Sequence, residues 1–178
     1  MKKTIIFILC FFISNSTLKS QEIDSCDTQK YKDALLHILN DTTIKGSIYV
    51  SDIVADLHRP LCEEIGEANC KYKKTLDSLN FKKYTWFEDF HSPLIEEIFK
   101  EHNRYLWYRE KGNILFFSTI EKNTLAAEVF IDMDRGQLNK LTFKRSHRFW
   151  GRPVYSYLFF FDCLGKIEDV FRITVIYE

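Results

Sequence analysis

The sequence predicts an α+β fold in which N-terminal helices pack on one face of a C-terminal antiparallel meander sheet of five or six strands. Two observations support this prediction. From Asp24 to about Asn103, apolar residues recur mainly at helical spacing, whereas from about Tyr105 to Tyr177 the chain becomes aromatic and β-branched. No repeat or linker divides residues 21–178, which are therefore expected to form a single α+β domain.

The first and last helices of the N-terminal half have the clearest signals. Tyr31, Ala34, Leu35 and Ile38 predict an amphipathic helix over residues 27–40. Near the end of this half, a serine followed by proline is typical of a helix start. One helical face then follows, made of Leu94, Ile95, Ile98, Phe99 and His102.

The segment between these helices is expected to contain two more. A short extended piece at residues 47–50 leads into a second helix, which begins at the capping residue Ser51 and ends before Pro60. Residues 71–79 are a candidate for a third helix.

Six segments of the C-terminal half have the pattern of strands: residues 105–109, 114–120, 124–132, 138–149, 154–161 and 167–177. Turn signals between them, at residues 111–113, 134–136, 151–152 and 164–165, predict connections of hairpin length. The first of the six segments also fits an extension of the preceding helix, so the sheet has five or six strands.

Side-chain alternation assigns the faces of this sheet. Along residues 124–132, apolar side chains alternate with polar ones such as Glu128, so one face is expected to be core and the other mostly wet. Residues 114–117 and 154–161 are apolar on both faces, which indicates that part of the second face is also covered. A curved sheet wrapped on helices is compatible with a cystatin-like or NTF2-like architecture, and this analogy concerns the fold only.

Composition limits the class of protein. Lys+Arg and Asp+Glu number 25 each, which argues against a basic nucleic-acid binder. Hydrophobic residues at 46% and aromatic residues at 16% exclude a disordered chain.

Residues 1–20 follow the plan of a secretory signal peptide: a basic start at Lys2 and Lys3, an apolar run and a polar end. The apolar run is too short for a transmembrane helix, which needs roughly 20 such residues. We therefore expect a secreted or periplasmic protein that has no stable membrane anchor after cleavage. Acylation at Cys10 and an uncleaved anchor are the alternatives. The cleaved chain would carry 22 basic and 25 acidic residues, because three lysines and no acids are removed.

Four cysteines lie outside the signal, and an even number in an exported chain predicts disulfides. Cys62 and Cys70 enclose a short loop, so a bridge between them is the first choice, and a bond between Cys26 and Cys163 would tie the N-terminal helix to the late sheet. Reduced, buried thiols are the alternative. No pair has the C-x₂₋₄-C spacing of a zinc site.

The chain has none of the common nucleophile, phosphate-binding, cofactor or metalloprotease motifs, so we expect no cofactor and no metal and assign no catalytic residue. Residues 132–136 begin like a calcium loop but lack its later oxygen ligands, and a turn explains them better. His102 lies on a predicted apolar helical face and is expected to be a hydrogen-bonded core histidine. His91 precedes a helix start, and the adjacent acids Glu96 and Glu97 diverge around the helix, so they do not form an acid–base pair.

The densest group of candidate binding residues lies on one predicted hairpin: Arg145, His147, Arg148, Trp150 and Arg152. A tryptophan between two arginines could bind a carboxylate, a phosphate, a sugar or a protein partner. The competing interpretation is a solvated, charge-paired sheet face, in which Lys140, Lys144 and Arg148 lie opposite Glu128 and Asp132.

Three functions remain open from the sequence. The first is a non-enzymatic exported protein that binds an unknown protein or small ligand, for example an inhibitor or immunity-type protein. The second is a small-molecule carrier whose aromatic-rich sheet encloses a pocket. The third is a hydrolase whose site is assembled from scattered residues, with His102 or His147 near a carboxylate and a nucleophile.

Overall fold

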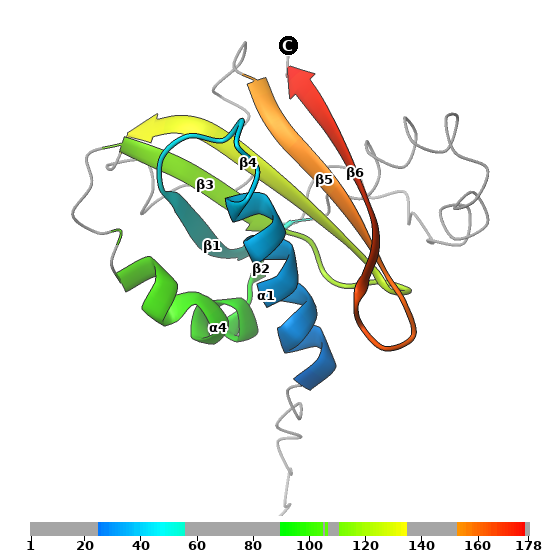
Figure 1. Cartoon of the computed structure of the whole chain (residues 1–178). Coiled ribbons are helices and arrows are strands. Elements are labelled where there is room, and N and C mark those ends of the chain that lie inside the picture. The colour runs from blue at the N-terminus through cyan, green and yellow to red at the C-terminus, as the bar shows by residue number, and fades with distance from the viewer. Residues whose placement is uncertain (1–24, 56–89, 105, 107–110, 135–152, 177–178) are drawn as a thin grey trace, which may run out of the picture.

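A computed structural model describes residues 25–55, 90–104, 106, 111–134 and 153–176. Within these residues, two helices and six strands form an α+β fold (Figure 1). In chain order the elements are α1 (Ser25–Leu39), β1 (Ile48–Val54), β2 (Phe90–His91), α4 (Pro93–Arg104), β3 (Lys111–Phe117), β4 (Thr124–Asp134), β5 (Pro153–Phe161) and β6 (Ile167–Ile176). The predicted helix at 71–79 and the predicted strands at 105–109 and 138–149 lie outside the described residues, Leu106 excepted.

The six strands form one sheet in the order β2-β1-β3-β4-β5-β6. From β3 to β6 each strand pairs antiparallel with the next, which confirms an antiparallel meander in this half of the chain. The predicted order is corrected at one point: residues 124–132 were expected to pair with residues 138–149, but β4 pairs directly with β5. β1 runs parallel to β3, so the sheet is mixed, and the prediction of a purely antiparallel sheet is corrected. A parallel pair needs a long crossover between its strands, and α4 lies in the segment that connects β1 to β3.

The helix predicted to begin at Ser51 is wrong over the described residues, because the chain continues as a strand to Val54. The segment is rich in β-branched and aromatic residues, and pairing with β3 buries Ile48, Val50 and Val54. Ser51 does not cap a helix. Its hydroxyl accepts a hydrogen bond from the Ile53 amide at 3.1 Å, inside an irregular stretch where the register with β3 shifts.

The turn predicted at residues 111–113 is also wrong, because these residues begin β3. Their turn-like composition has another cause. A Cβ at Gly112 would lie 3.1 Å from the Ser47 hydroxyl, and the Asn113 amide donates to the Lys45 carbonyl at 2.9 Å. Gly112 therefore leaves room for the loop before β1 to pass close to β3, and the Asn113 side chain bonds that loop.

The connection between β3 and β4 contains a tight turn that the sequence did not reveal. Lys122 and Asn123 both have positive φ, 47° and 61°, and Glu121 and Thr124 exchange backbone hydrogen bonds across them. Two consecutive residues with positive φ are characteristic of the type I′ turns that match the twist of a hairpin.

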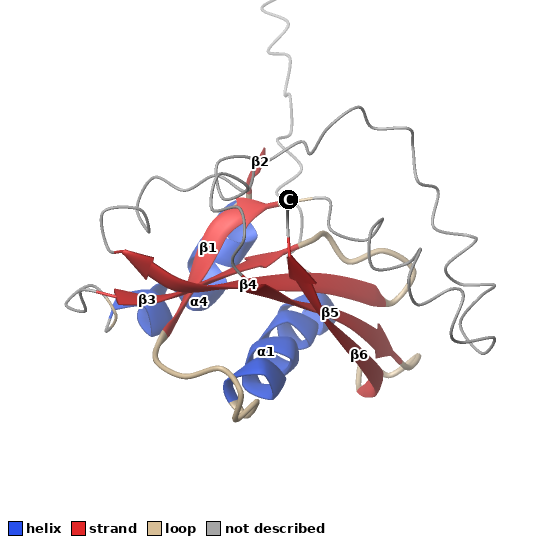
Figure 2. Cartoon of the chain, turned by 90° about the horizontal axis from the view of Figure 1, so that it is seen from above, coloured by secondary structure: helices blue, strands red, loops and turns tan. Residues whose placement is uncertain are grey.

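Both helices pack on one face of the sheet, as predicted, and form the larger core with it (Figure 2 shows α1 beneath the strands). Phe117 of β3 is fully buried where the two helices meet the sheet. Its ring lies 5.3 Å from the ring of Tyr31 in α1 and 5.8 Å from that of Phe99 in α4. This side chain therefore joins both helices to one strand.

The second face of the central strands is buried as well. Phe116, Ala126, Leu158 and Phe160 are each at most 3% exposed, which confirms the expectation from the apolar runs in β3 and β5. The expectation that the polar face of residues 124–132 is wet is wrong at Thr124 and Glu128, which are 0% and 1% exposed, and is confirmed at Asp132, which is exposed near the end of the strand. Glu128 is buried because β4 lies between two strands that are apolar on both faces. Its carboxylate accepts a hydrogen bond from the Ser156 hydroxyl at 3.2 Å.

The last turn of α4 covers the part of β1 that β2 does not reach. The Asn103 amide donates to the Val50 carbonyl at 2.8 Å and accepts from the Val50 N–H at 3.0 Å. The His102 ring donates from Nε2 to the Ile48 carbonyl at 2.8 Å. Unpaired backbone groups on a strand edge invite aggregation, and here two helix side chains bond them. His102 is thus the hydrogen-bonded histidine that the sequence predicted.

Asp41 links the end of α1 to strands β5 and β6 on the face of the sheet that the helices cover. Its carboxylate accepts a hydrogen bond from the Tyr157 hydroxyl at 2.7 Å, lies 3.3 Å from Arg172 Nε and accepts from the Thr43 hydroxyl at 2.6 Å. Burial acts to raise the pKa of this carboxyl, but the bonds from Thr43 and Tyr157 and the charge of Arg172 outweigh it and lower the pKa to about 2.

We expect this carboxylate to make stability depend on acidity. Because the pKa is about 2 in the folded state and 3.8 normally, ionised Asp41 stabilises the fold above pH 3.8, and the contribution is lost as the pH falls toward 2. The shift corresponds to about 2 kcal/mol. Urea unfolding of Asp41→Asn at pH 7 should show a loss of that size, and the variant should depend less on pH between 2 and 4 than the unsubstituted chain. Glu101→Gln, whose side chain is 70% exposed, is the control, and an equal loss there would refute the prediction.

Candidate functional site

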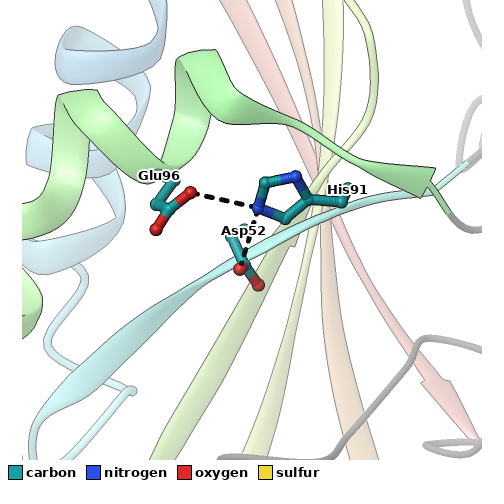
Figure 3. Close-up of side chains that lie close together, drawn as sticks. All are labelled: Asp52, His91 and Glu96. Atoms are coloured by element: carbon teal, nitrogen blue, oxygen red, sulfur yellow. Dashed lines mark hydrogen bonds and ion pairs between the residues drawn. The ribbon is translucent and has the colours of Figure 1, made fainter.

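Three ionisable side chains converge where β1, β2 and the start of α4 meet (Figure 3). His91 Nε2 lies 3.1 Å from Glu96 Oε2 and 3.4 Å from Asp52 Oδ2. One ligand atom of each residue lies within 4.8 Å of the other two. Among the described residues, no other group of three or more His, Cys, Asp or Glu side chains converges closely enough to hold a metal ion.

Each of the three residues is held by a backbone contact of its element. Asp52 lies in the irregular stretch of β1, and its carbonyl accepts from the Ser92 amide at 2.8 Å. His91 is the pairing partner of Ile53 in the adjacent strand. Glu96 is in the first turn of α4, where its amide donates to the Ser92 carbonyl at 3.1 Å. The three side chains are therefore attached to a sheet edge and a helix end.

The corner is open to solvent and negatively charged. The exposed fractions of the side chains of Asp52, His91 and Glu96 are 41%, 49% and 60%. Burial raises the pKa of the nearby Tyr49 hydroxyl, and the charges of Asp52 and Glu96 raise it further. The field of the two carboxylates thus reaches the neighbouring part of β1.

The arrangement places two carboxylate oxygens around one imidazole nitrogen. A neutral imidazole has one N–H and one lone pair, so Nε2 can donate a single proton between the two oxygens or present a lone pair beside them. In the second state the corner offers one nitrogen and two oxygen donors to a cation. Imidazole and carboxylate are both common ligands of divalent transition metals.

The binding residues predicted from the sequence are not at this corner. Arg145, His147, Arg148, Trp150 and Arg152 lie outside the described residues, so the structure does not test the basic hairpin. The alternative charge-paired face places residues 138–149 beside residues 124–132, but β4 pairs with β3 and β5, and Glu128 is buried.

The predicted cysteine pairs have different outcomes. Cys62 and Cys70 lie outside the described residues. Cys26 and Cys163 are described and are not joined by a disulfide. The first turn of α1 nevertheless lies against the turn that carries Cys163, because a Cβ at Gly165 would be 2.8 Å from Cys26 Sγ. Gly165 has φ +78°, so both its backbone conformation and this contact require glycine.

Other described histidines do not form the acid–base arrangement of a hydrolase. His102 bonds a backbone carbonyl, as described above, and His37 lies edge-on to the Phe159 ring at 5.6 Å. His58 and His147 lie outside the described residues.

The sequence indicates His91 and Glu96 only as separate polar residues and predicts no metal-binding residue. The serine–proline signal correctly placed His91 before a helix and Glu96 in its first turn, so these two were recognisable as neighbours. Asp52 was missed because its segment was predicted to be helical, and because only the pairing of β1 with β2 brings it to His91.

No family model matches the chain, and neither the curated proteins nor the solved structures include a match. Among the described residues, no helix combines the length and the apolar character needed to cross a membrane.

Proposed function

We propose that the protein is exported and acts by binding, and that its ligand carries positive charge and occupies the corner formed by Asp52, His91 and Glu96. The observation that supports this proposal is the convergence of the two carboxylates on His91 Nε2, at 3.1 and 3.4 Å, with all three side chains open to solvent. Export is supported by the signal-like residues 1–20.

The exposure of the corner favours binding over catalysis. Electrostatic catalysis depends on groups fixed in a site from which water is excluded, where charges interact strongly. Side chains that are 41% to 60% exposed are surrounded by water, which weakens such interactions. The same exposure gives a ligand direct access without rearrangement of the fold.

Binding can be tested by neutralising the corner without changing its shape. In the assay, the purified full chain is incubated with the extracytoplasmic fraction of its own cells, and the captured ligand is measured. The double variant Asp52→Asn/Glu96→Gln should lose most of this capture. Capture should also fall with rising salt, since the attraction involves exposed charges. Bound material is measured by mass spectrometry for macromolecules and by elemental analysis for ions.

The matched control is Glu97→Gln/Glu101→Gln, which removes the same charge from the exposed side of α4, where the side chains are 72% and 70% exposed. Equal loss in both double variants would show that net charge matters and the corner does not. Unchanged capture by the corner variant would place binding elsewhere on the chain.

A further inference from the structure

We propose that the charged ligand of this corner is a divalent transition-metal ion, held by Asp52, Glu96 and Nε2 of His91. This inference rests on the proposed function, because it specifies the ligand of the same site. The three donors come from β1, β2 and α4, so a bound ion would join two strands and a helix.

The separations of the donor atoms are compatible with a metal ion. Ligands around a metal with bonds of about 2.0–2.2 Å lie about 3.0–3.5 Å apart in tetrahedral or octahedral geometry. Acceptors that surround an ammonium group at about 2.8 Å lie about 4.6 Å apart. The separations from His91 Nε2, 3.1 and 3.4 Å, are in the metal range, and the 3.1 Å separation is also that of a hydrogen bond between Nε2 and Glu96.

The donor types narrow the class of metal. Calcium and magnesium prefer oxygen ligands only, whereas an imidazole nitrogen beside two carboxylates suits zinc and its first-row neighbours. Two carboxylates also balance the charge of a divalent ion. To ligate through Nε2, the neutral His91 ring carries its hydrogen on Nδ1, which Figure 3 shows directed away from both carboxylates.

Three protein ligands leave at least one coordination position open. Structural zinc sites are normally closed by four protein ligands, and sites with three keep a position for water or an incoming ligand. At an exposed corner this position can accept an oxygen or nitrogen donor from another molecule.

Zinc chloride is the probe for the test, added to the purified full chain in competition with a chromophoric chelator. We expect one zinc to bind at the corner, and His91→Ala and Glu96→Gln each to lower its affinity by about tenfold or more, since losing even an outer-shell partner of a metal ligand costs that much. Zinc should also raise the melting temperature, because it binds the native state, whereas magnesium and calcium should not. Glu97→Gln should bind zinc like the unsubstituted chain.

Two results would overturn the inference: no zinc binding by the unsubstituted chain, or equal affinity in His91→Ala, Glu96→Gln and Glu97→Gln. Zinc held by cysteines would give the second result, because the corner variants leave every thiol in place. The proposed function fails separately. If zinc does not bind but the corner variant still loses its captured ligand, the corner is a binding site for a different cation.

Discussion

Replacing Phe117 with alanine is expected to lower the free energy of unfolding by about 3–5 kcal/mol, the largest single effect that we predict. The side chain is 0% exposed and its ring contacts Tyr31 in α1 and Phe99 in α4. Alanine would remove apolar contacts and leave a cavity between two helices and a strand. Neither helix can fill it without moving away from other core residues.

Urea unfolding at neutral pH measures this effect, with Leu164→Ala as the control. Leu164 is 74% exposed in the turn between β5 and β6, so its replacement should change stability by no more than about 0.5 kcal/mol. A loss below about 1 kcal/mol for Phe117→Ala would contradict the packing of both helices on this ring.

Asn103→Ala is expected to cost about 2–4 kcal/mol, the second largest effect. Its amide bonds both backbone groups of Val50, which is 1% exposed. The substitution leaves a buried N–H and a buried C=O without these bonds, and each such group costs about 1–3 kcal/mol. Asn103→Asp should be destabilising too, because a second oxygen would face the Val50 carbonyl.

Native-state hydrogen exchange gives a local readout for this prediction. The Val50 amide should exchange faster in Asn103→Ala by more than the global loss of stability explains. The matched control is Glu101→Ala, two residues before Asn103 in the same helix. The Glu101 side chain is 70% exposed, so its replacement should leave exchange at Val50 unchanged. If both variants behave alike, the Asn103 side chain does not protect the edge of β1.

Both ends of helix α4 contact strand β1 or the residues beside it. Its first turn supplies Glu96 to the charged corner, and its last turn supplies His102 and Asn103 to the backbone of β1. Both ends therefore act on the same strand, which also carries Asp52. A change that detaches α4 from β1 is expected to disturb the corner and the core together.

Much of the fold was predictable because its signals are local. The spacing of Tyr31, Ala34, Leu35 and Ile38 identified α1, and the serine–proline pair identified the start of α4. The apolar runs in β3 and β5 indicated correctly that both faces of the central sheet are covered. These features depend on side chains within a few residues of one another, which is the range that periodicity and capping report.

The errors arose where a distant partner decides the conformation. Serine is a common helix-capping residue, which is why the sequence predicts a helix start at Ser51. Its neighbours Val50 and Val54 instead pair with residues of β3 that lie more than 60 positions further along the chain. The alternation of polar and apolar residues around Glu128 is typical of a strand with one solvated face, yet β3 and β5, which are rich in apolar residues, flank it on both sides. In both cases burial contributed by residues far along the chain outweighs a weak local preference.

The sequence by itself determined the α+β class, the two described helices, the four strands β3 to β6 as antiparallel segments and the presence of His91 and Glu96 around one helix start. Tertiary structure decided that β1 is a strand parallel to β3 and that Asp52 lies beside His91. Local patterns encode which surface a segment must bury, but not which distant segment will bury it. The candidate cation site depends on that second choice, because its third residue arrives only when β1 pairs with β2.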